Sequence, residues 1–420
     1  MNEIKVQITR PKILLLQSYF QPEKIASTHL FDDLFASLVH SGYLLEVYAP
    51  YPTRGITKEE RKACIKDRKD ESLYDGQMAV HRFPLFREGK HSLPRAFRYL
   101  LCILMQTYYG LKAKNCDVLF LASTPPINGL MMAVLHKFKK YKIVYNLQDI
   151  FPDSLVHTGM TRHGSLLWKI GRWVENVTYR AADKIIVISE GFKQNIMAKG
   201  VPEEKIAVIP NWVDENQVTP IDRTENPLFE KYGLDRGKFY ICYSGNIGHT
   251  QNMEMLTETA KLLEDHENIG FVMIGDGAFK PKLEEIIAQK GLKNITLLPF
   301  QDYAAISQVF SLGDVGLIIS KKGVGTNSVP SKTWSIMSAG RPVLASFDED
   351  SELCRIITET GCGICIPPDD AAALTTAIKD MYNNRAGLAA MGKQGRDYIL
   401  RHLTKKIGTQ QYVDVLKIYM

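Results

Sequence analysis

The sequence predicts an α/β protein with two Rossmann-like, doubly wound domains that face each other across a cleft. At 420 residues the chain is longer than one hydrophobic core usually supports. Short apolar runs alternate with longer amphipathic stretches, a pattern typical of parallel sheets crossed by helices. Open sheets of this kind bind ligands at the carboxyl ends of their strands, so two such domains create a cleft between them.

The first half of the chain contains one complete alternating series. Residues 12–18 predict a strand, residues 29–41 a helix that ends before Gly42, and residues 44–49 a second strand. Further apolar runs predict strands at 80–83, 118–122, 142–147, 184–188 and 206–209, with helical spacing at 126–138 and 166–182. We therefore predict an N-terminal domain over residues 1–212.

A polar, proline-containing stretch interrupts the alternation and predicts a linker at residues 213–236. A second series follows, with strands expected at 239–244, 270–274, 295–298, 315–319, 343–345 and 363–366 and helices at 253–265, 280–289, 304–312 and 331–338. This series predicts a C-terminal domain over residues 237–400. The closing segment, with a helix expected at 401–420, is predicted to pack back toward the N-terminal domain.

The charge is distributed unevenly between the two halves. Lys and Arg minus Asp and Glu gives 30 minus 20, or +10, for residues 1–212, and 22 minus 26, or −4, for residues 213–420. Between Arg82 and Lys114, seven basic residues accompany only Glu88, and they flank the apolar run 99–105. Such a helix suits an anionic membrane surface, although a solvated basic edge beside a core helix explains it equally well.

Compartment and cofactors are constrained by what the chain does not contain. No apolar run approaches the ~20 residues that span a bilayer, and no secretory signal opens the sequence. Seven irregularly spaced cysteines argue against a disulfide framework, and the single pair Cys362 and Cys365 cannot complete a zinc site. We expect a cytoplasmic protein, at most peripheral at the inner membrane, without a nucleic-acid partner.

Two turns of the second domain have the residues that approach a phosphate. Residues 327–343 form a polar, proline-marked turn before a short helix, where Lys332 and helix-start amides converge. Gly245, after the strand at 239–244, lets the backbone approach a diphosphate. Gly275 and Gly277 follow the next strand, but without a third glycine they form only half of a dinucleotide fingerprint.

These segments, YSGNIGHTQN, VMIGDG and NSVPSKTWSIMSAGRPV, resemble the nucleotide-sugar domain of glycosyltransferase family 4, and IPNWVD and residues 147–160 resemble its polysaccharide-building branch. The resemblance implies the GT-B fold and a retaining transfer from a nucleotide sugar. The donor contacts it implies are Gly245, Asn246, Gln251, Gly275, Phe300, Asn327, Val329, Pro330, Ser331 and Ser335, together with Lys332 as the residue that stabilises the leaving group. A core role is the alternative for Phe300.

The chain departs from the family pattern at four of these positions. Asn246 and Gln251 stand where relatives hold Arg and Lys against the diphosphate, and Asn327 and Ser335 replace a pair of glutamates. The missing positive charges place more of the leaving-group stabilisation on Lys332, with Arg341 or Lys322 as possible helpers. The amide and hydroxyl can still hydrogen-bond a ribose or a sugar.

The first domain supplies the expected acceptor side. Asp149 follows an apolar strand and precedes a turn forced by Pro152, so the resemblance implies that its carboxylate orients or deprotonates the acceptor hydroxyl, with Gln148 at the position of the usual histidine. A turn-capping Asp is the alternative. Glu23, Ser27 and His29 of the first βα loop are candidate acceptor contacts, or parts of an ordinary capped loop.

The expected activity is that of a hexosyl- or N-acetylhexosaminyl-type glycosyltransferase. Asp348 and Asp350 form a D-x-D late in the second domain, where we expect no metal, and no cofactor is expected besides the UDP-sugar co-substrate. The implied acceptor is a lipid-linked saccharide, and front-face attack is preferred because no residue offers a convincing nucleophile. A UDP-sugar epimerase and a non-catalytic nucleotide-sugar-binding protein remain alternatives.

Overall fold

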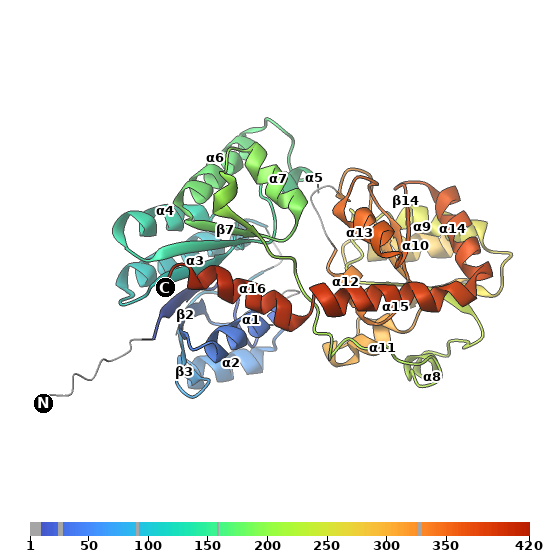
Figure 1. The fold of residues 1–420 in the computed structure, drawn as a ribbon, viewed down its shortest axis with the longest axis horizontal. Coiled ribbons are helices and arrows are strands. Elements are labelled where there is room, and N and C mark those ends of the chain that lie inside the picture. The colour runs from blue at the N-terminus through green and yellow to red at the C-terminus, as the bar shows by residue number, and fades with distance from the viewer. Residues whose placement is uncertain (1–9, 24–27, 90–91, 158, 326–329) are drawn as a thin grey trace, which may run out of the picture. The chain divides into compact units, whose positions relative to one another are not determined.

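The computed structural model describes residues 10–23, 28–89, 92–157, 159–325 and 330–420. The chain divides into two compact units (Figure 1). The first comprises Met1–Ile209 with Thr409–Met420, and the second comprises Pro210–Gly408. Each unit has its own parallel sheet, so the predicted α/β class with two doubly wound domains is confirmed.

The first unit is built on an eight-stranded sheet of order β3-β4-β2-β1-β5-β6-β7-β8. All neighbours are parallel except β3, which pairs antiparallel with β4 at the edge. Its strands are β1 Lys12–Leu16, β2 Leu44–Pro50, β3 Asp70–Leu73, β4 Met78–Phe83, β5 Val118–Ala122, β6 Lys142–Leu147, β7 Lys184–Val187 and β8 Ile206–Val208. The central strands are buried over nearly their whole length because helices cover both faces of the sheet.

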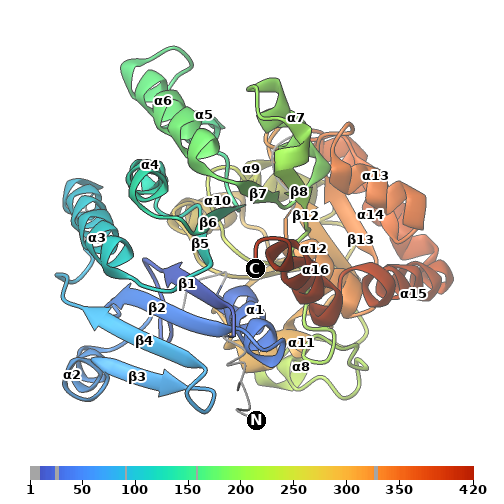
Figure 2. The ribbon, with the colours of Figure 1, turned by 60° about the vertical axis from the view of Figure 1, so that its left-hand side comes forward.

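Helices α3, α4 and α6 lie side by side on one face of this sheet (Figure 2). On the other face, Tyr412 of α16 packs edge-on against Phe120 of β5 with ring centroids 6.1 Å apart. The helices of this unit are α1 Thr28–His40, α2 Lys58–Asp67, α3 Ser92–Lys112, α4 Asn128–Phe138, α5 Asp153–His157, α6 Leu166–Ala181 and α7 Glu190–Ala198, with a 3₁₀ turn at Glu203–Lys205. The closing helix α16, Lys405–Lys417, belongs to this unit from Thr409 onward.

The second unit contains a fully parallel six-stranded sheet of order β11-β10-β9-β12-β13-β14. Its strands are β9 Phe239–Ser244, β10 Ile269–Ile274, β11 Ile295–Leu298, β12 Val315–Ile319, β13 Val343–Ser346 and β14 Gly363–Ile366. Alternate residues of β9 enter two separate cores, Tyr240 and Cys242 on one face and Ile241 and Tyr243 on the other. This period of two is what a buried strand requires.

The helices of the second unit complete these two cores. They are α8 Leu228–Lys231, α9 Met253–Leu262, α10 Lys280–Lys290, α11 Ile306–Phe310, α12 Lys332–Ser338, α13 Glu352–Thr360, α14 Ala371–Asn383 and α15 Arg385–His402, with a 3₁₀ turn at Tyr303–Ala305. Helix α14 was not predicted from the sequence. Its buried face, Leu374 and Ile378, lies against the core that contains Ile241.

Residues 213–236, predicted to be a linker, are an integral part of the second unit. Val218 and Phe229 are 1% exposed within its core. Arg223 donates to the carbonyl oxygens of Arg236 and Lys238 at 2.8 and 2.6 Å, which fastens the segment to the start of β9. The polar, proline-rich composition therefore marks an irregular but packed segment, because Val213, Val218, Leu228 and Phe229 are buried.

Candidate functional site

The loops after β9 and β10 approach each other so closely that their glycines cannot be replaced without a shift. The N–H of Gly245 donates to Ile274 O at 3.0 Å, and the N–H of Ile247 donates to Asp276 O at 2.8 Å. A Cβ added at Gly275 would lie 1.9 Å from the carbonyl oxygen of Gly245. These glycines create a narrow backbone turn at the carboxyl edge of the sheet, the edge where doubly wound sheets bind ligands.

Lys332, the first residue of α12, projects into this turn. Its ammonium group donates to the phenol oxygen of Tyr243 at 2.8 Å and lies 4.0 Å from the centroid of that ring. A Cβ at Gly245 would be 3.2 Å from the Lys332 nitrogen, so the absence of a side chain at Gly245 leaves the amine its place. Sequence reasoning missed Tyr243, which reads as an ordinary β9 residue between Cys242 and Ser244.

Lys332 has an unusual electrostatic environment for a lysine. Within the described ranges no carboxylate forms an ion pair with its amine, and burial lowers the pKa of Lys332 to about 7. Burial raises the pKa of the Tyr243 phenol, so Tyr243 is neutral. Its hydroxyl donates a hydrogen bond to Asn246 O at 2.5 Å. The positive charge of this turn thus lacks a protein counter-ion, and an anionic ligand would supply one.

The two positions that depart from the family pattern lie in the same turn. Asn246 is exposed, and the side-chain oxygen of Gln251 accepts the N–H of Gly248 at 3.1 Å. Gln251 therefore stabilises the loop by accepting this hydrogen bond, which a lysine side chain cannot do because it has no acceptor. The glycines, Asn246, Gln251 and Lys332 come together in the second unit, as the resemblance implies.

The segment that enters α12 is only partly described. Asn327 and Val329 lie outside the described residues, whereas Pro330, Ser331 and Ser335 surround the start of the helix. The Ser331 side chain is exposed and does not cap α12, and Ser335 is partly exposed. Phe300 is 75% exposed just beyond β11, so the alternative that it is a core residue is wrong.

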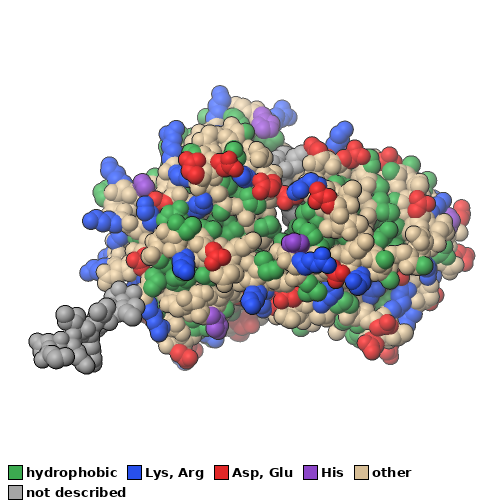
Figure 3. All heavy atoms as spheres, viewed as in Figure 1, with side chains coloured by type: hydrophobic (Ala, Val, Ile, Leu, Met, Phe, Trp, Pro, Cys, Tyr) green, Lys and Arg blue, Asp and Glu red, His purple; other side chains and the backbone are tan. Residues whose placement is uncertain are grey.

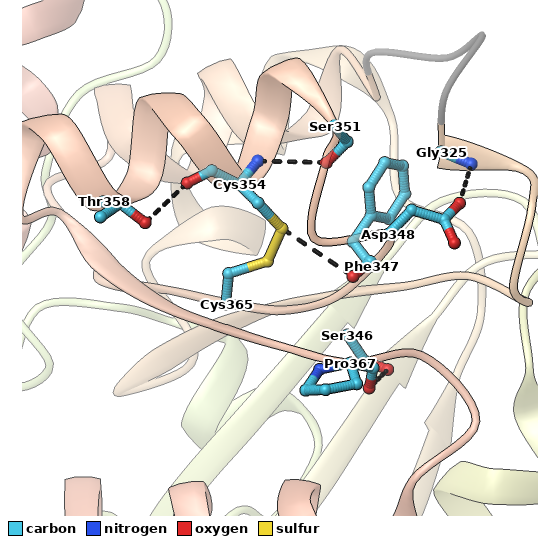
Figure 4. Close-up of a disulfide and its surroundings, with 9 residues drawn as sticks. All are labelled: Gly325, Ser346, Phe347, Asp348, Ser351, Cys354, Thr358, Cys365 and Pro367. Atoms are coloured by element: carbon cyan, nitrogen blue, oxygen red, sulfur yellow. Dashed lines mark hydrogen bonds between the residues drawn. A yellow bond between two sulfur atoms is a disulfide. The ribbon is translucent and has the colours of Figure 1, made fainter.

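Asp348, which follows β13, holds the loop after β12 in place by hydrogen bonds. Its carboxylate accepts the N–H of Gly325 at 2.7 Å (Figure 4). It also accepts the N–H of Gly323 at 2.9 and 3.0 Å. This explains one acid of the D-x-D as a structural residue that is 8% exposed. No cluster of three or more metal-ligating side chains occurs in the described part of the chain.

Cys354 of α13 and Cys365 of β14 form a disulfide beside Asp348, with their Cα atoms 5.5 Å apart (Figure 4). The cysteine count had not predicted a bonded pair. The two positions meet because α13 turns the chain back onto β14 within 11 residues. The second cysteine of the C-x-x-C pair is therefore bonded outside the pair, while Cys362 is free and buried.

The two possible helpers of Lys332 have other roles. The Arg341 guanidinium donates to the carbonyl oxygens of Ile221 and Ser311 at 2.8 and 3.1 Å, where it fastens residues 213–236 to the sheet. The Lys322 backbone N–H donates to Asp369 at 3.3 Å, and its side chain is exposed. Arg341 precedes β13 and therefore lies at the amino edge of the parallel sheet, whereas Gly245 and Lys332 follow β9 and β12 at the carboxyl edge, which argues against a role of Arg341 at the phosphate.

In the first unit, Gln148 and Asp149 follow β6 directly. Gln148 donates from its side-chain amide to the buried Asn146 at 2.9 Å, and Tyr412 approaches the same Asn146 oxygen at 3.1 Å. Asp149 is exposed at the carboxyl edge of the sheet. Asp153, a weaker candidate, is bound by Lys199 at 2.7 Å and Asn195 at 3.2 Å.

Glu23 has a structural task that its loop position did not reveal. It is 2% exposed, and its carboxylate accepts the N–H groups of Thr53 and Arg54 at 2.6 and 3.0 Å and that of Phe20 at 3.2 Å. It therefore joins the loops after β1 and β2. Ser27 lies outside the described residues, and His29 is a half-buried residue in the first turn of α1.

A small pocket opens beside Glu23. It is lined by Tyr19, Phe20, Gln21, Glu23, Thr28, Phe31, Asp32 and Phe35. Burial, with the neighbouring charge of Asp33, raises the pKa of Asp32 to about 6. Asp32 was not predicted as a site residue, because in the sequence it is one acid on an amphipathic helix.

Comparisons with known proteins agree with this geometry. The model "Glycosyltransferase Family 4" matches residues 31–217, and "Glycosyl transferases group 1" matches residues 224–398. The putative colanic acid biosynthesis glycosyl transferase WcaI of Escherichia coli K12 is 27% identical over 97% of this chain and 100% of its own length. The probable glycosyltransferase WbjE of Pseudomonas aeruginosa is 28% identical over 72% of this chain and 74% of its own.

Solved structures give the same fold. Sucrose-phosphate synthase from Thermosynechococcus elongatus superposes with a TM-score of 0.75 at 14% identity, covering 97% of this chain and 98% of its own. Anabaena HepE in complex with UDP and glucose superposes with a TM-score of 0.72 at 16% identity, covering 97% and 100%. With both halves matched by glycosyltransferase models in the expected order, the chain belongs to glycosyltransferase family 4, has the GT-B fold, and is a glycosyltransferase of the polysaccharide-building branch.

Proposed function

We propose that this glycosyltransferase moves a sugar, of the hexosyl or N-acetylhexosaminyl type, from a UDP-sugar to a lipid-linked saccharide with retention of anomeric configuration. The observation on which the proposal depends is Lys332 beside Tyr243 in the glycine-lined turn. Lys332 is half-buried, and no described carboxylate pairs with its amine, which suits a diphosphate whose charge increases as the sugar leaves. UDP is the proposed nucleotide because HepE, which has the same fold, was solved with it.

The proposed chemistry needs no metal and no covalent intermediate. The glycine turn brings backbone N–H groups and Lys332 to the diphosphate, which lowers the cost of breaking the anomeric C–O bond. The acceptor hydroxyl attacks from the same side, and the departing phosphate oxygen or Asp149 takes its proton. Ser335 supplies a neutral hydrogen-bonding group where relatives use a carboxylate.

The proposed membrane partner is supported by one face of the first unit. Adjacent helices α3, α4 and α6 together expose an apolar surface, which we call the apolar helix face: Leu93, Phe97, Leu100, Leu104, Tyr108, Leu111, Leu130, Val134, Phe138, Leu166, Leu167, Ile170 and Trp173. The sole carboxylate in these three helices, Glu175, is buried and paired with Arg172 and Lys199. Lys and Arg side chains surround α3 and α4 in Figure 3.

An anionic bilayer complements such a face, because apolar side chains enter the interface while the flanking cations meet lipid headgroups. None of the helices in the described ranges is long and apolar enough to cross a membrane. We therefore propose a peripheral protein at the cytoplasmic side of the inner membrane. Sedimentation with phosphatidylglycerol vesicles should exceed that with phosphatidylcholine vesicles, and Leu104→Glu should abolish the difference.

The test of the activity is incubation with a panel of UDP-sugars and a membrane extract that contains lipid-linked saccharides. Transfer of label to lipid, lost in Lys332→Ala, supports the proposal. An isomerised UDP-sugar without transfer would indicate the epimerase, and saturable UDP-sugar binding without any product would indicate the non-catalytic binding protein. Either result would overturn the proposed reaction, and inversion of configuration in the product would overturn the retaining mechanism alone.

A further inference from the structure

A second group of cations without enough counter-charge lies in the first unit. Glu88, in the loop after β4, accepts two hydrogen bonds from the Arg54 guanidinium, at 3.0 and 2.5 Å. Arg95 and Arg98, in the first turns of α3, approach the same carboxylate at 3.0 and 4.0 Å. Three guanidinium groups thus share one acidic partner, and we call Arg54, Arg95 and Arg98 with Glu88 the arginine cluster.

Tyr19 joins the cluster from the loop after β1. Its hydroxyl donates to Glu88 at 2.9 Å, and the guanidinium carbons of Arg54 and Arg98 lie 4.5 and 6.0 Å from its ring centroid. Hydrogen bonds from Arg54 and Tyr19, with the charges of Arg54 and Arg98, outweigh burial and lower the pKa of Glu88. The cluster therefore holds three positive charges and one negative charge, a net charge of +2.

Arg98 is the least compensated of the three. Its side chain is completely buried, and its Nε donates to Phe86 O at 3.1 Å. Among the residues that the structure describes, neither of its terminal nitrogens has a hydrogen-bond partner. A buried guanidinium without full compensation is unfavourable, so a protein retains it where it has a use. The side chains of Arg54 and Arg95 are 38% and 42% exposed, which leaves them open to a ligand from solution.

The position of the cluster matches a substrate site. Tyr19, Arg54 and Glu88 follow β1, β2 and β4, three parallel strands whose carboxyl ends meet at one edge of the sheet. Arg95 and Arg98 begin the same helix whose exposed Leu93, 82% exposed, and Phe97, 56% exposed, open the apolar helix face. Arginine side chains and exposed apolar side chains are therefore interleaved at this end of α3.

We propose that the arginine cluster binds the phosphate or diphosphate group of a lipid-linked acceptor. This inference rests on the proposed function for the nature of the acceptor. Arg54 and Arg95 contact the phosphoryl oxygens through their planar, multi-donor guanidinium groups, and Arg98 adds a charge from the protein interior. Glu88 keeps the arginines ordered in the absence of ligand. The isoprenoid part of the acceptor then follows the exposed apolar residues of α3.

The test uses the full chain saturated with UDP, so that the nucleotide site is occupied, and titrates inorganic pyrophosphate and farnesyl diphosphate by calorimetry. Arg54→Gln and Arg95→Gln should each weaken binding of both probes about tenfold, the loss expected when a charge-assisted hydrogen bond is removed. The matched control is Arg180→Gln, an exposed arginine at the end of α6, on the opposite edge of the same sheet. A thermal unfolding transition like that of the wild type in every variant shows that the protein is folded, because UDP affinity reports on the second unit and the substituted arginines belong to the first.

Each outcome decides a separate point. Tighter binding of farnesyl diphosphate than of pyrophosphate, lost in both cluster variants, supports the proposal. Equal binding of the two probes overturns the assignment to a lipid acceptor. Any of three results overturns the site itself: wild-type affinity for the probes in both cluster variants, an equal loss of affinity in Arg180→Gln, or binding of the probes only in the absence of UDP. If the cluster variants lose binding to phosphatidylglycerol vesicles but bind both probes as the wild type does, the cluster binds bulk lipid headgroups and the proposal is overturned. Arginine-dependent binding in a protein that never transfers sugar contradicts the proposed function and leaves the site standing.

Discussion

The ammonium group of Lys332 lies against the face of the Tyr243 ring, 4.0 Å from its centroid, and donates to the hydroxyl of the same residue at 2.8 Å. Lys332 begins α12 and Tyr243 is near the end of β9, so the pair joins the two elements that border the glycine turn. The ring and hydroxyl hold the amine at the turn without neutralising it, since burial keeps the phenol protonated. The charge is thus retained for a ligand.

Removal of this amine should weaken turnover more than folding. We expect Lys332→Ala to lower kcat/KM for the donor by about 10²- to 10³-fold, the range found when one preorganised donor is lost from a developing charge. Steady-state transfer assays measure this. Lys293→Ala, an exposed lysine before β11 at the opposite edge of the sheet, is the control and should keep wild-type activity. A tenfold loss or less in Lys332→Ala would contradict the role of Lys332.

UDP binding should take up a proton. Because burial lowers the pKa of Lys332 to about 7, part of the free protein holds a neutral amine at pH 7.5, and a bound diphosphate favours the charged form. Affinity should therefore fall as pH rises from 7 to 9. Calorimetry at pH 7.5 in buffers of different ionisation enthalpy should show proton uptake, and Lys332→Met should abolish both the uptake and the pH dependence. Identical heats in all buffers would refute the shift.

The loops after β9 and β10 approach each other so closely that one methyl group added at Gly275 should strongly weaken UDP binding. In Gly275→Ala the new Cβ would lie 1.9 Å from Gly245 O, so the two loops must separate. We expect UDP affinity to fall at least tenfold. Gly89→Ala has open space around its new Cβ and is the matched control. Fluorescence titration with UDP measures both, and equal affinities would show that the turn does not contact the nucleotide.

Asp149 should act on transfer and not on donor binding. Asp149→Asn preserves size and removes the charge that orients or deprotonates the acceptor hydroxyl, and we expect kcat to fall about 10²-fold. The affinity for UDP should stay within about twofold, because Asp149 belongs to the first unit and the glycine turn to the second. Asp75→Asn, an exposed acid in the β3–β4 turn, should change neither value. Parallel losses of binding and turnover would contradict this division.

The raised pKa of Asp32 predicts that ionisation of its carboxyl group lowers the stability of the folded protein. Its folded-state pKa of about 6 lies above the usual value for Asp, so the native state binds more protons and stability falls as pH rises between about 4 and 6. Asp32→Asn should stabilise the protein by roughly 1 kcal/mol at pH 7.5, after a discount for partial solvent screening, and not at pH 4. Thermal melts at the two pH values test this. An equal shift of Tm at both would reject it.

The sequence by itself determined the two doubly wound sheets, because strand and helix periodicities are local and the glycine and lysine positions follow strands that are easily recognised. It also indicated the donor side, since Gly245 and Gly275 directly follow predicted strands and Lys332 lies at the start of a predicted helix. The packed segment at 213–236 and helix α14 escaped prediction, because burial there depends on residues distant in the chain.

Only the tertiary structure decided which side chains meet. Glu23 and Thr53 are 30 positions apart, Arg54 and Glu88 are 34 apart, and Tyr243 and Lys332 are 89 apart. Each pair is brought together by strand order, which places the carboxyl ends of β1, β2 and β4, or of β9 and β12, at one edge of a sheet. Strand order is set by packing over the whole unit, and no local sequence pattern records it.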